Sequence, residues 1–132
     1  MLDKAKREHA RLIANFDIDH VFNFFVTANH IRDYVENSDL VNQADIELLF
    51  QDSDMKDCRD LCDKAKHLHL TKRPDPITHR FGGMVGRDCI GAFYIGAGEV
   101  WELWSNDRHV NIGHLSNRVI EKWEAFFEVH KL

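Results

Sequence analysis

The two prolines of the chain, Pro74 and Pro76, separate two segments of different character. Proline cannot continue a helix, and it pushes the residue before it toward an extended conformation. Residues 1–73 have the apolar periodicity of helices, whereas six of the seven glycines lie between residues 82 and 98, among β-branched and aromatic residues. The sequence therefore predicts helices before the prolines, and strands with turns after them.

Each segment can be divided into elements with recognisable ends. The expected elements are helices over about 2–15, 17–37, 43–51 and 53–70, strands within about 77–114, and a last helix over 116–131. Asp17, Ser53 and Ser116 are the expected N-caps, and a hairpin is expected to turn at Ser105–Asp107. We find no linker, so residues 1–132 are expected to form a single, mainly α domain with a small antiparallel hairpin or sheet before the C-terminal helix.

Composition and charge argue against several classes of protein: general nucleic-acid binders, membrane proteins and secreted proteins. The formal net charge of −5 argues against bulk electrostatic capture of nucleic acid or of an anionic membrane. A local basic patch would have to come from residues 4–11 or 69–73. The chain has no run of 18 apolar residues and no apolar leader, so neither a membrane span nor secretion is expected. Three cysteines without framework spacing fit reduced thiols and a cytoplasmic protein.

The helix expected over 17–37 is apolar around more than half of its circumference. Such a helix must be contacted on several sides, either within the domain or at a subunit interface, and this suggests a homodimer. The remaining narrow strip carries polar side chains at spacings of three and four, and we call it the polar seam: His20, Asn23, Thr27, His30 and Tyr34. The seam either faces solvent or a neighbouring helix, or it lines a site.

The helix expected over 53–70 carries an apolar stripe on one face and a line of charges on another. The stripe consists of Met55, Cys58, Leu61, Cys62, Ala65 and Leu68. Arg59, Asp63 and His67 follow one another at intervals of four residues. A carboxylate beside His67 would raise the pKa of its imidazole and orient it, as in a general acid or base. An ordinary solvated helix face has the same pattern, so the question is whether this charged line meets the polar seam.

Other chemical motifs are weak. Cys58 and Cys62 are one turn apart, but they lie within the apolar stripe, and His69 is too far along the helix to share a metal ion with them. The sequence contains no phosphate-binding glycine loop and no GxSxG element. The three tryptophans are expected to pack the hairpin against the last helix. Neither a metal nor a cofactor is expected.

Two stretches resemble a known group of proteins. "NFFVTANHIRDYV" (23–35) and "CRDLCDKAKHLHL" (58–70) are similar to paired helices of small, largely uncharacterised bacterial and phage-associated proteins. The resemblance implies roles for His30, Asp33, Arg59, Asp60, Asp63, Lys66 and His67. The arrangement also looks like the HEPN superfamily of helical bundles, many of which cleave RNA with an Arg and a His five to seven positions later on one helix. Arg59 and Asp60 match the start of that motif, whereas His67, eight residues after Arg59, departs from its spacing.

Two functions follow as expectations. The first is a non-catalytic helical interaction module of a bacterial mobile element or phage, which binds protein or nucleic acid such as RNA and forms a homodimer. Its candidate binding residues are Asn23, His30, Asp33, Tyr34 and Lys66. The alternative is a HEPN-like, metal-independent ribonuclease of the toxin or defence type. In that enzyme Arg59 would stabilise the phosphorane charge, His67 would transfer protons, and Asp63 or Asp60 would orient them.

Overall fold

The computed structural model describes residues 1–66, 77–81, 100–105 and 108–132, with the backbone alone for residues 66, 77–81 and 100–105. In chain order, the elements of these residues are α1 (Leu2–Ala14), α2 (Ile18–Glu36), α3 (Gln43–Leu49), α4 (Ser53–Lys66), β1 (Ile77–Phe81), β2 (Val100–Ser105), β3 (Arg108–Asn111) and α5 (Ile112–His130). The prediction of a mainly helical chain is confirmed. None of the described helices is long and apolar enough to cross a membrane.

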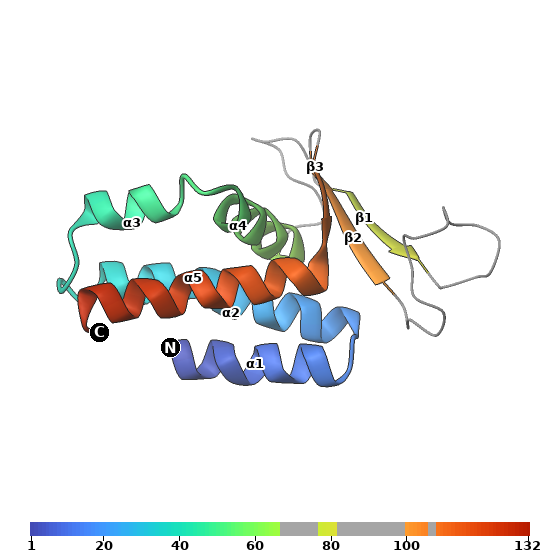
Figure 1. The fold of residues 1–132 in the computed structure, drawn as a ribbon, viewed down its shortest axis with the longest axis horizontal. Helices are drawn as coiled ribbons and strands as arrows, with labels where there is room; N and C mark the ends of the chain where they lie inside the picture. Colours follow the sequence, from blue (N-terminus) through green and yellow to red (C-terminus); the bar gives the residue numbers. More distant parts are fainter. Residues whose placement is uncertain (67–76, 82–99, 106–107) are drawn as a thin grey trace.

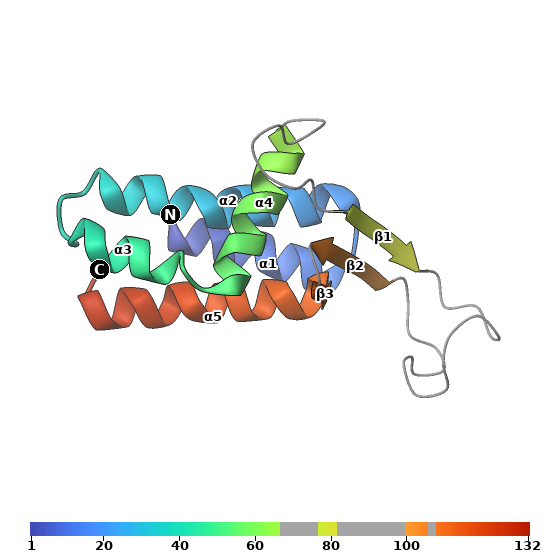
Figure 2. The same ribbon diagram turned by 90° about the horizontal axis from the view of Figure 1, so that it is seen from above.

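The helices are arranged in three layers (Figure 1). α2 and α5 lie side by side in the middle layer, and α1 packs against both of them on one side. α3 and α4 lie on the other side, where α4 crosses the middle layer steeply and contacts both of its helices (Figure 2). α1 and α4 are therefore separated by the middle layer.

The core is centred on α2 and α5. Phe24, Phe25 and Ile31 of α2 and Trp123 of α5 are fully buried. Each such side chain stabilises the fold by roughly 1.5–3 kcal/mol when it leaves water. Because α2 is contacted by α1, α3, α4 and α5 of the same chain, most of its apolar circumference is covered without a second subunit. The feature that suggested a homodimer in the sequence is thus explained within one chain.

The three strands form one antiparallel sheet in the order β1–β2–β3. Leu103 of β2 is opposite Thr78 of β1 and Val110 of β3, and Ser105 is opposite Arg108. β3 runs directly into α5, so the sheet lies at the N-terminal end of that helix (Figure 2). Of the turn predicted at Ser105–Asp107, residues 106 and 107 lie outside the described residues.

Side-chain caps stand at the starts of α2, α3, α4 and α5. Asp17 caps α2 as predicted, because its Oδ1 accepts a hydrogen bond from the backbone N–H of Asp19 at 2.8 Å. α4 begins at Ser53, but the capping side chain is Asp52. Its Oδ1 accepts from the backbone N–H groups of Asp54 at 2.9 Å and Met55 at 3.3 Å. The prediction of Ser53 as the cap was wrong by one residue.

The last helix begins four residues before the predicted start at residue 116. Asn111 is its N-cap, and the Asn111 side-chain oxygen accepts from the backbone N–H of His114 at 2.9 Å. Ser116, the predicted cap, is buried inside α5 and donates its hydroxyl to the carbonyl of Gly113 at 2.7 Å. The predicted start was wrong because Asn111 satisfies the first free N–H groups before the chain reaches Ser116. Residues 67–70 of the other long predicted helix lie outside the described residues.

Candidate functional site

The polar seam lies along the edge of α2 that faces α1. Thr27 is buried, His20 and His30 are half-buried, and Asn23 and Tyr34 are exposed. The ring of Phe24, on the same side of α2, contacts the imidazole of His9 on α1, with ring centroids 5.3 Å apart. Thr27, about 60° from Phe24 around the helix, is therefore the seam residue that faces the interior, whereas Asn23 and Tyr34 are part of the solvated surface.

α4 packs on the opposite side of α2. The Sγ of Cys58 donates a hydrogen bond to the carbonyl of Phe25 at 3.8 Å. At 100° per residue, Phe25 is about 160° from Thr27 around the helix. Figure 1 agrees, because α1 and α4 lie on either side of the α2–α5 layer. The structure thus does not bring Arg59 of α4 and Tyr34 of the seam together.

The charged residues of α4 are only partly described. The guanidinium of Arg59 donates from Nε and Nη2 to Oδ1 of Asp60, at 3.1 Å and 3.0 Å. Asp60 is buried and Asp63 is half-buried. The side chain of Lys66 and the whole of His67 lie outside the described residues. The proposed acid–base pair of Asp63 and His67 therefore stays a prediction.

Asp33, another candidate binding residue, is exposed at the end of α2. Its backbone carbonyl accepts hydrogen bonds from the backbone and the side chain of Asn37.

Cys58 and Cys62 are fully buried, as the apolar stripe predicts. Burial raises the pKa of the Cys58 thiol well above its usual value, which keeps it protonated and unreactive. Among the described residues, no group of three His, Cys, Asp or Glu side chains could hold a metal ion.

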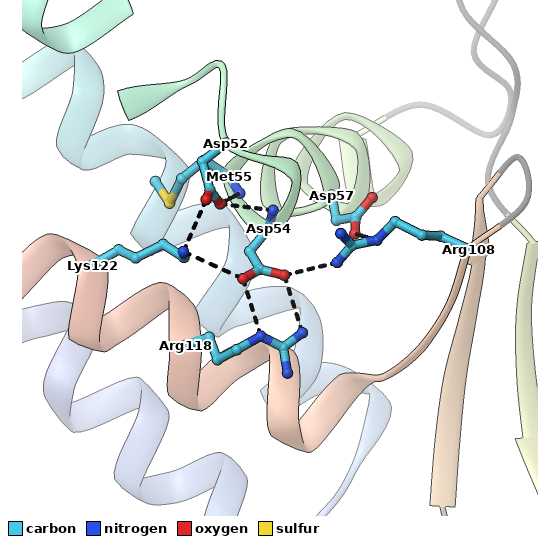
Figure 3. A network of polar contacts seen from close by, with 7 residues as sticks. All are labelled: Asp52, Asp54, Met55, Asp57, Arg108, Arg118 and Lys122. Carbon is cyan, nitrogen blue, oxygen red and sulfur yellow. Dashed lines mark hydrogen bonds and ion pairs between the residues drawn. The ribbon is translucent and has the colours of Figure 1, made fainter. Parts of the chain in front are cut away.

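An ionic cluster that sequence reasoning missed joins the start of α4 to β3 and α5 (Figure 3). Its members are Asp52, Asp54, Asp57, Arg108, Arg118 and Lys122. Asp54 is the centre: it accepts from Nη2 and Nε of Arg118, both at 3.0 Å, and from Nη2 of Arg108 at 2.8 Å. Lys122 Nζ lies 2.9 Å from Oδ2 of Asp52 and 3.5 Å from Oδ2 of Asp54. The cluster fixes the sheet and α5 to the start of α4.

The two buried aspartates of the ionic cluster differ in pKa. Burial acts to raise the pKa of Asp54, but its hydrogen bonds and ionic contacts with Arg118, Arg108 and Lys122 outweigh burial and lower that pKa. For Asp57 burial prevails and raises the pKa from 3.8 to about 6, although Arg108 opposes the shift. Oδ2 of Asp57 lies 3.3 Å from Nε of Arg108, but within the described part of the chain neither atom makes a hydrogen bond.

The ionic cluster joins separate elements by charge pairing. Its three carboxylates face three cations, so the formal charges of these six residues cancel. The one sequence signal that could have found it is the series Asp52, Asp54 and Asp57, together with Arg118 and Lys122 one turn apart on the last helix. Sequence alone gives no reason to pair these two segments.

The second feature missed in the sequence is a groove where the ends of α1, α2 and α5 meet, here called the terminal groove. Its volume is about 370 Å³, and its lining residues are Met1, Leu2, Asp3, Tyr34, Val35, Ser38, Leu40, Phe127 and Leu132. Tyr34 and Leu40, which belong to this lining, are 58% and 72% exposed. One candidate binding residue, Tyr34, thus lies in an apolar hollow.

A shallower hollow lies on the other side of the last turns of α5. It has a volume of about 290 Å³ and is lined by Leu49 of α3 and by Lys122, Ala125, Phe126, Val129 and His130 of α5. Val129 is 75% exposed, and Leu48, beside Leu49, is 64% exposed. The end of the bundle that contains the C-terminus therefore presents apolar side chains from α2, α3 and α5.

Comparisons of the chain with protein-family models, with curated proteins and with solved structures find no match.

Proposed function

We propose that this protein is a non-catalytic helical module that binds another protein through the terminal groove. The observation that supports this proposal is the pair of exposed apolar residues in that groove, Tyr34 and Leu40, which contribute little to the core. Clustered apolar residues on a surface are typical of protein-binding sites. The predicted binding residue Tyr34 belongs to this surface.

A protein partner fits the described surface better than a nucleic acid does. Residues 33–55, here called the acidic segment, contain seven Asp or Glu residues, while all 17 Lys and Arg residues lie elsewhere. The acidic segment includes the end of α2, the following loop and α3, and it contributes Tyr34 and Leu40 to the terminal groove. Glu36 is paired with Arg32, and Asp52 and Asp54 belong to the ionic cluster. The other four carboxylates of the segment, Asp33, Asp39, Asp45 and Glu47, are exposed and would repel phosphate groups.

The homodimer and the ribonuclease have less support. Contacts within one chain cover α2, so its composition no longer requires a second copy. In a ribonuclease Arg59 would have to reach a phosphate, yet its guanidinium is held by the neighbouring Asp60. The HEPN-like fold and the origin in a phage or mobile element depend on motif resemblance alone, and the proposed binding function requires neither.

Site-specific photo-crosslinking tests the proposed function. Tyr34 is replaced by p-benzoylphenylalanine in cells that express the protein naturally, and the matched control places the same residue at Asp19, which is exposed near the other end of the same helix. We expect irradiation to give a protein adduct from position 34 and none from position 19. An RNA adduct at position 34, or equal adducts at both positions, would overturn the proposal.

A second assay addresses the alternative enzyme. Purified protein is incubated with RNA in the presence of a metal chelator, and the variants Arg59→Ala and His67→Ala are compared with the unaltered chain. We expect no degradation above background in any sample. Cleavage that is lost in both variants would replace the binding module by the ribonuclease.

A further inference from the structure

We infer that Arg108 makes a pH-dependent contact between the sheet and the start of α4. Its guanidinium is bound to Asp54 whether Asp57 is charged or neutral, and it forms a second hydrogen bond, to Asp57, only when that carboxyl is charged. The attachment of β3 to α4 therefore tightens as the pH rises and loosens as it falls. This inference is independent of the proposed binding function, because β3 joins the N-terminal end of α5 and the terminal groove lies at the other end.

The contact between Arg108 and Asp57 is incomplete (Figure 3). Nε of the guanidinium lies 3.3 Å from Oδ2 of Asp57, which is within ion-pair distance, yet neither of these buried atoms has a hydrogen-bond partner in the described ranges. Nη2 of the same guanidinium does donate to Oδ1 of Asp54, at 2.8 Å. Since an unmade hydrogen bond leaves a buried donor and a buried acceptor unsatisfied, the arrangement gains free energy when Nε turns to donate to a charged Asp57.

Arg108 is the partner that can turn. Its side chain is 40% exposed, whereas those of Asp54 and Asp57 are 9% and 7% exposed. Arg118 also fixes Asp54, because its Nε and Nη2 donate to the two oxygens of that carboxylate at 3.0 Å. A small rotation of the Arg108 side chain, with Nη2 still bonded to Asp54, therefore moves Nε toward or away from Asp57.

The charge of Asp57 depends on groups from three elements. Burial and the carboxylates of Asp54 and Asp60 on α4 favour its neutral form. Arg108 of β3 and Arg118 of α5 favour its charged form. Burial prevails and raises the pKa of Asp57 to about 6, so this carboxyl changes charge between about pH 5 and 7. The pKa of Asp54 is lowered, so Asp54 and the two arginines keep their charges in that interval.

The contact and the whole fold depend on pH in opposite directions. Ionisation of Asp57 costs free energy in the folded protein because the carboxylate is buried, so the free energy of unfolding falls as the pH rises through 6. Once the carboxylate is charged, it attracts the guanidinium of Arg108, and β3 is attached more strongly than it is to the neutral acid. The attraction reduces the cost of ionisation but does not cancel it, since the pKa of Asp57 stays above 3.8.

The sheet responds to this change at its junction with the bundle. Arg108 is the first residue of β3, opposite Ser105 of β2, and the four residues of β3 lead directly into α5. The sheet packs on α5 through β2 and β3 and has much less contact with α4. The Arg108 contact thus links α4 to the start of the strand that precedes the last helix, and protonation of Asp57 weakens that link.

NMR of side-chain signals tests the inference. The Cγ signal of Asp57 and the Nε–H signal of Arg108 are followed from about pH 4.5 to 8 in the unaltered protein, and we expect both to change with one common midpoint near pH 6. Once Asp57 is charged, the Nε–H of Arg108 should also exchange with water about twofold to fivefold more slowly relative to that of Arg7, because a hydrogen bond shields it. Arg7 is the internal reference because it is exposed on α1. Separate midpoints, or a ratio of exchange rates that does not change with pH, would overturn the inference.

Two variants separate the contact from a structural effect. In Asp57→Asn the Arg108 signal should no longer titrate near pH 6, whereas in the matched control Asp45→Asn, at an exposed carboxylate of α3, it should titrate as before. Arg108→Met removes the guanidinium, and the midpoint of Asp57 should then rise, since that charge favours ionisation. An Arg108 signal that still titrates in Asp57→Asn, or an Asp57 midpoint that does not rise in Arg108→Met, would overturn the inference. The titration of the unaltered protein decides the question even if either variant fails to fold.

Discussion

Asp54 and Asp57 lie on the same helix three residues apart and are both buried, yet the structure lowers the pKa of one and raises that of the other. The difference comes from hydrogen bonding. Asp54 accepts charged hydrogen bonds from two arginines, whereas the contact of Asp57 with Arg108 lacks hydrogen-bond geometry. A buried carboxylate without enough hydrogen bonds is stabilised by taking up a proton.

Asp57→Asn is expected to stabilise the protein at pH 8. Because the pKa of Asp57 is raised from 3.8 to about 6, its contribution to the free energy of unfolding is fully present below pH 3.8 and is lost as pH rises through 6. The neutral amide avoids that loss, which amounts to about 3 kcal/mol for such a change in pKa. Urea unfolding of the variant and the unaltered protein at pH 8, 6 and 4.5 measures the difference in their free energies of unfolding. A gain that is as large at pH 4.5 as at pH 8 would contradict the prediction.

Asp54→Asn is expected to have the opposite effect. The lowered pKa of Asp54 means that its stabilisation is present above the pKa of the unfolded chain and is lost as pH falls through the folded pKa. At pH 8 the amide should lower the free energy of unfolding by about 3 kcal/mol, because it breaks a buried network and leaves Arg118 without its partner. The same urea series checks this, with the exposed Asp45→Asn as the control that should change little.

At the level of elements, the sequence predicted which segments are helical better than where they begin. Apolar periodicity located the helices because it records which side chains face the core, and burial of that face stabilises them. The start of α4 was predicted correctly, whereas its capping residue and the start of α5 were misplaced by local chemistry. Asp52 and Ser53 are both good caps, as are Asn111 and Ser116, and only the path of the incoming chain decides which one meets the free N–H groups.

The candidate site was harder to predict for a different reason. Helical spacing correctly separated Cys58 and Cys62 from the charged face of α4, since that is a property of one helix. Whether α4 meets the polar seam depends on which side of α2 it packs, and the apolar surface of α2 allows several. The ionic cluster and the terminal groove each require three elements to come together, and neither can be inferred from a single helix.

Replacing Asp52 by Ala should destabilise the protein by about 1–2 kcal/mol. The change removes the cap of α4 and the 2.9 Å ion pair of Asp52 with Lys122 of α5. Ser53→Ala is the matched control, because Ser53 is the neighbouring residue and a good cap by type, but is exposed. Thermal unfolding of both variants measures the difference. An equal or larger loss from Ser53→Ala would show that the cap is Ser53 after all.

On the scale of the whole molecule, the two ends of α5 carry different kinds of side chain. The sheet joins the bundle at the N-terminal end of α5 and is fixed there by Arg108 of the ionic cluster. The opposite end of α5 meets the ends of α1 and α2, and there the exposed apolar residues and the acidic segment occur together. The exposed leucines at that end should be unimportant for folding if their role is to bind a partner.

Leu40→Ala and Leu48→Ala are therefore expected to change the free energy of unfolding by no more than about 0.5 kcal/mol each. Both side chains are largely exposed, at 72% and 64%, so truncation removes little buried apolar area and leaves no cavity. Leu61→Ala on α4 is the matched control. That leucine is fully buried, and its truncation should cost about 2–5 kcal/mol. Urea unfolding compares the three variants at one pH. A loss of 2 kcal/mol or more from Leu40→Ala would mean that this leucine serves the core and would remove the main support for the binding site, because a residue required for folding gives no evidence of a partner.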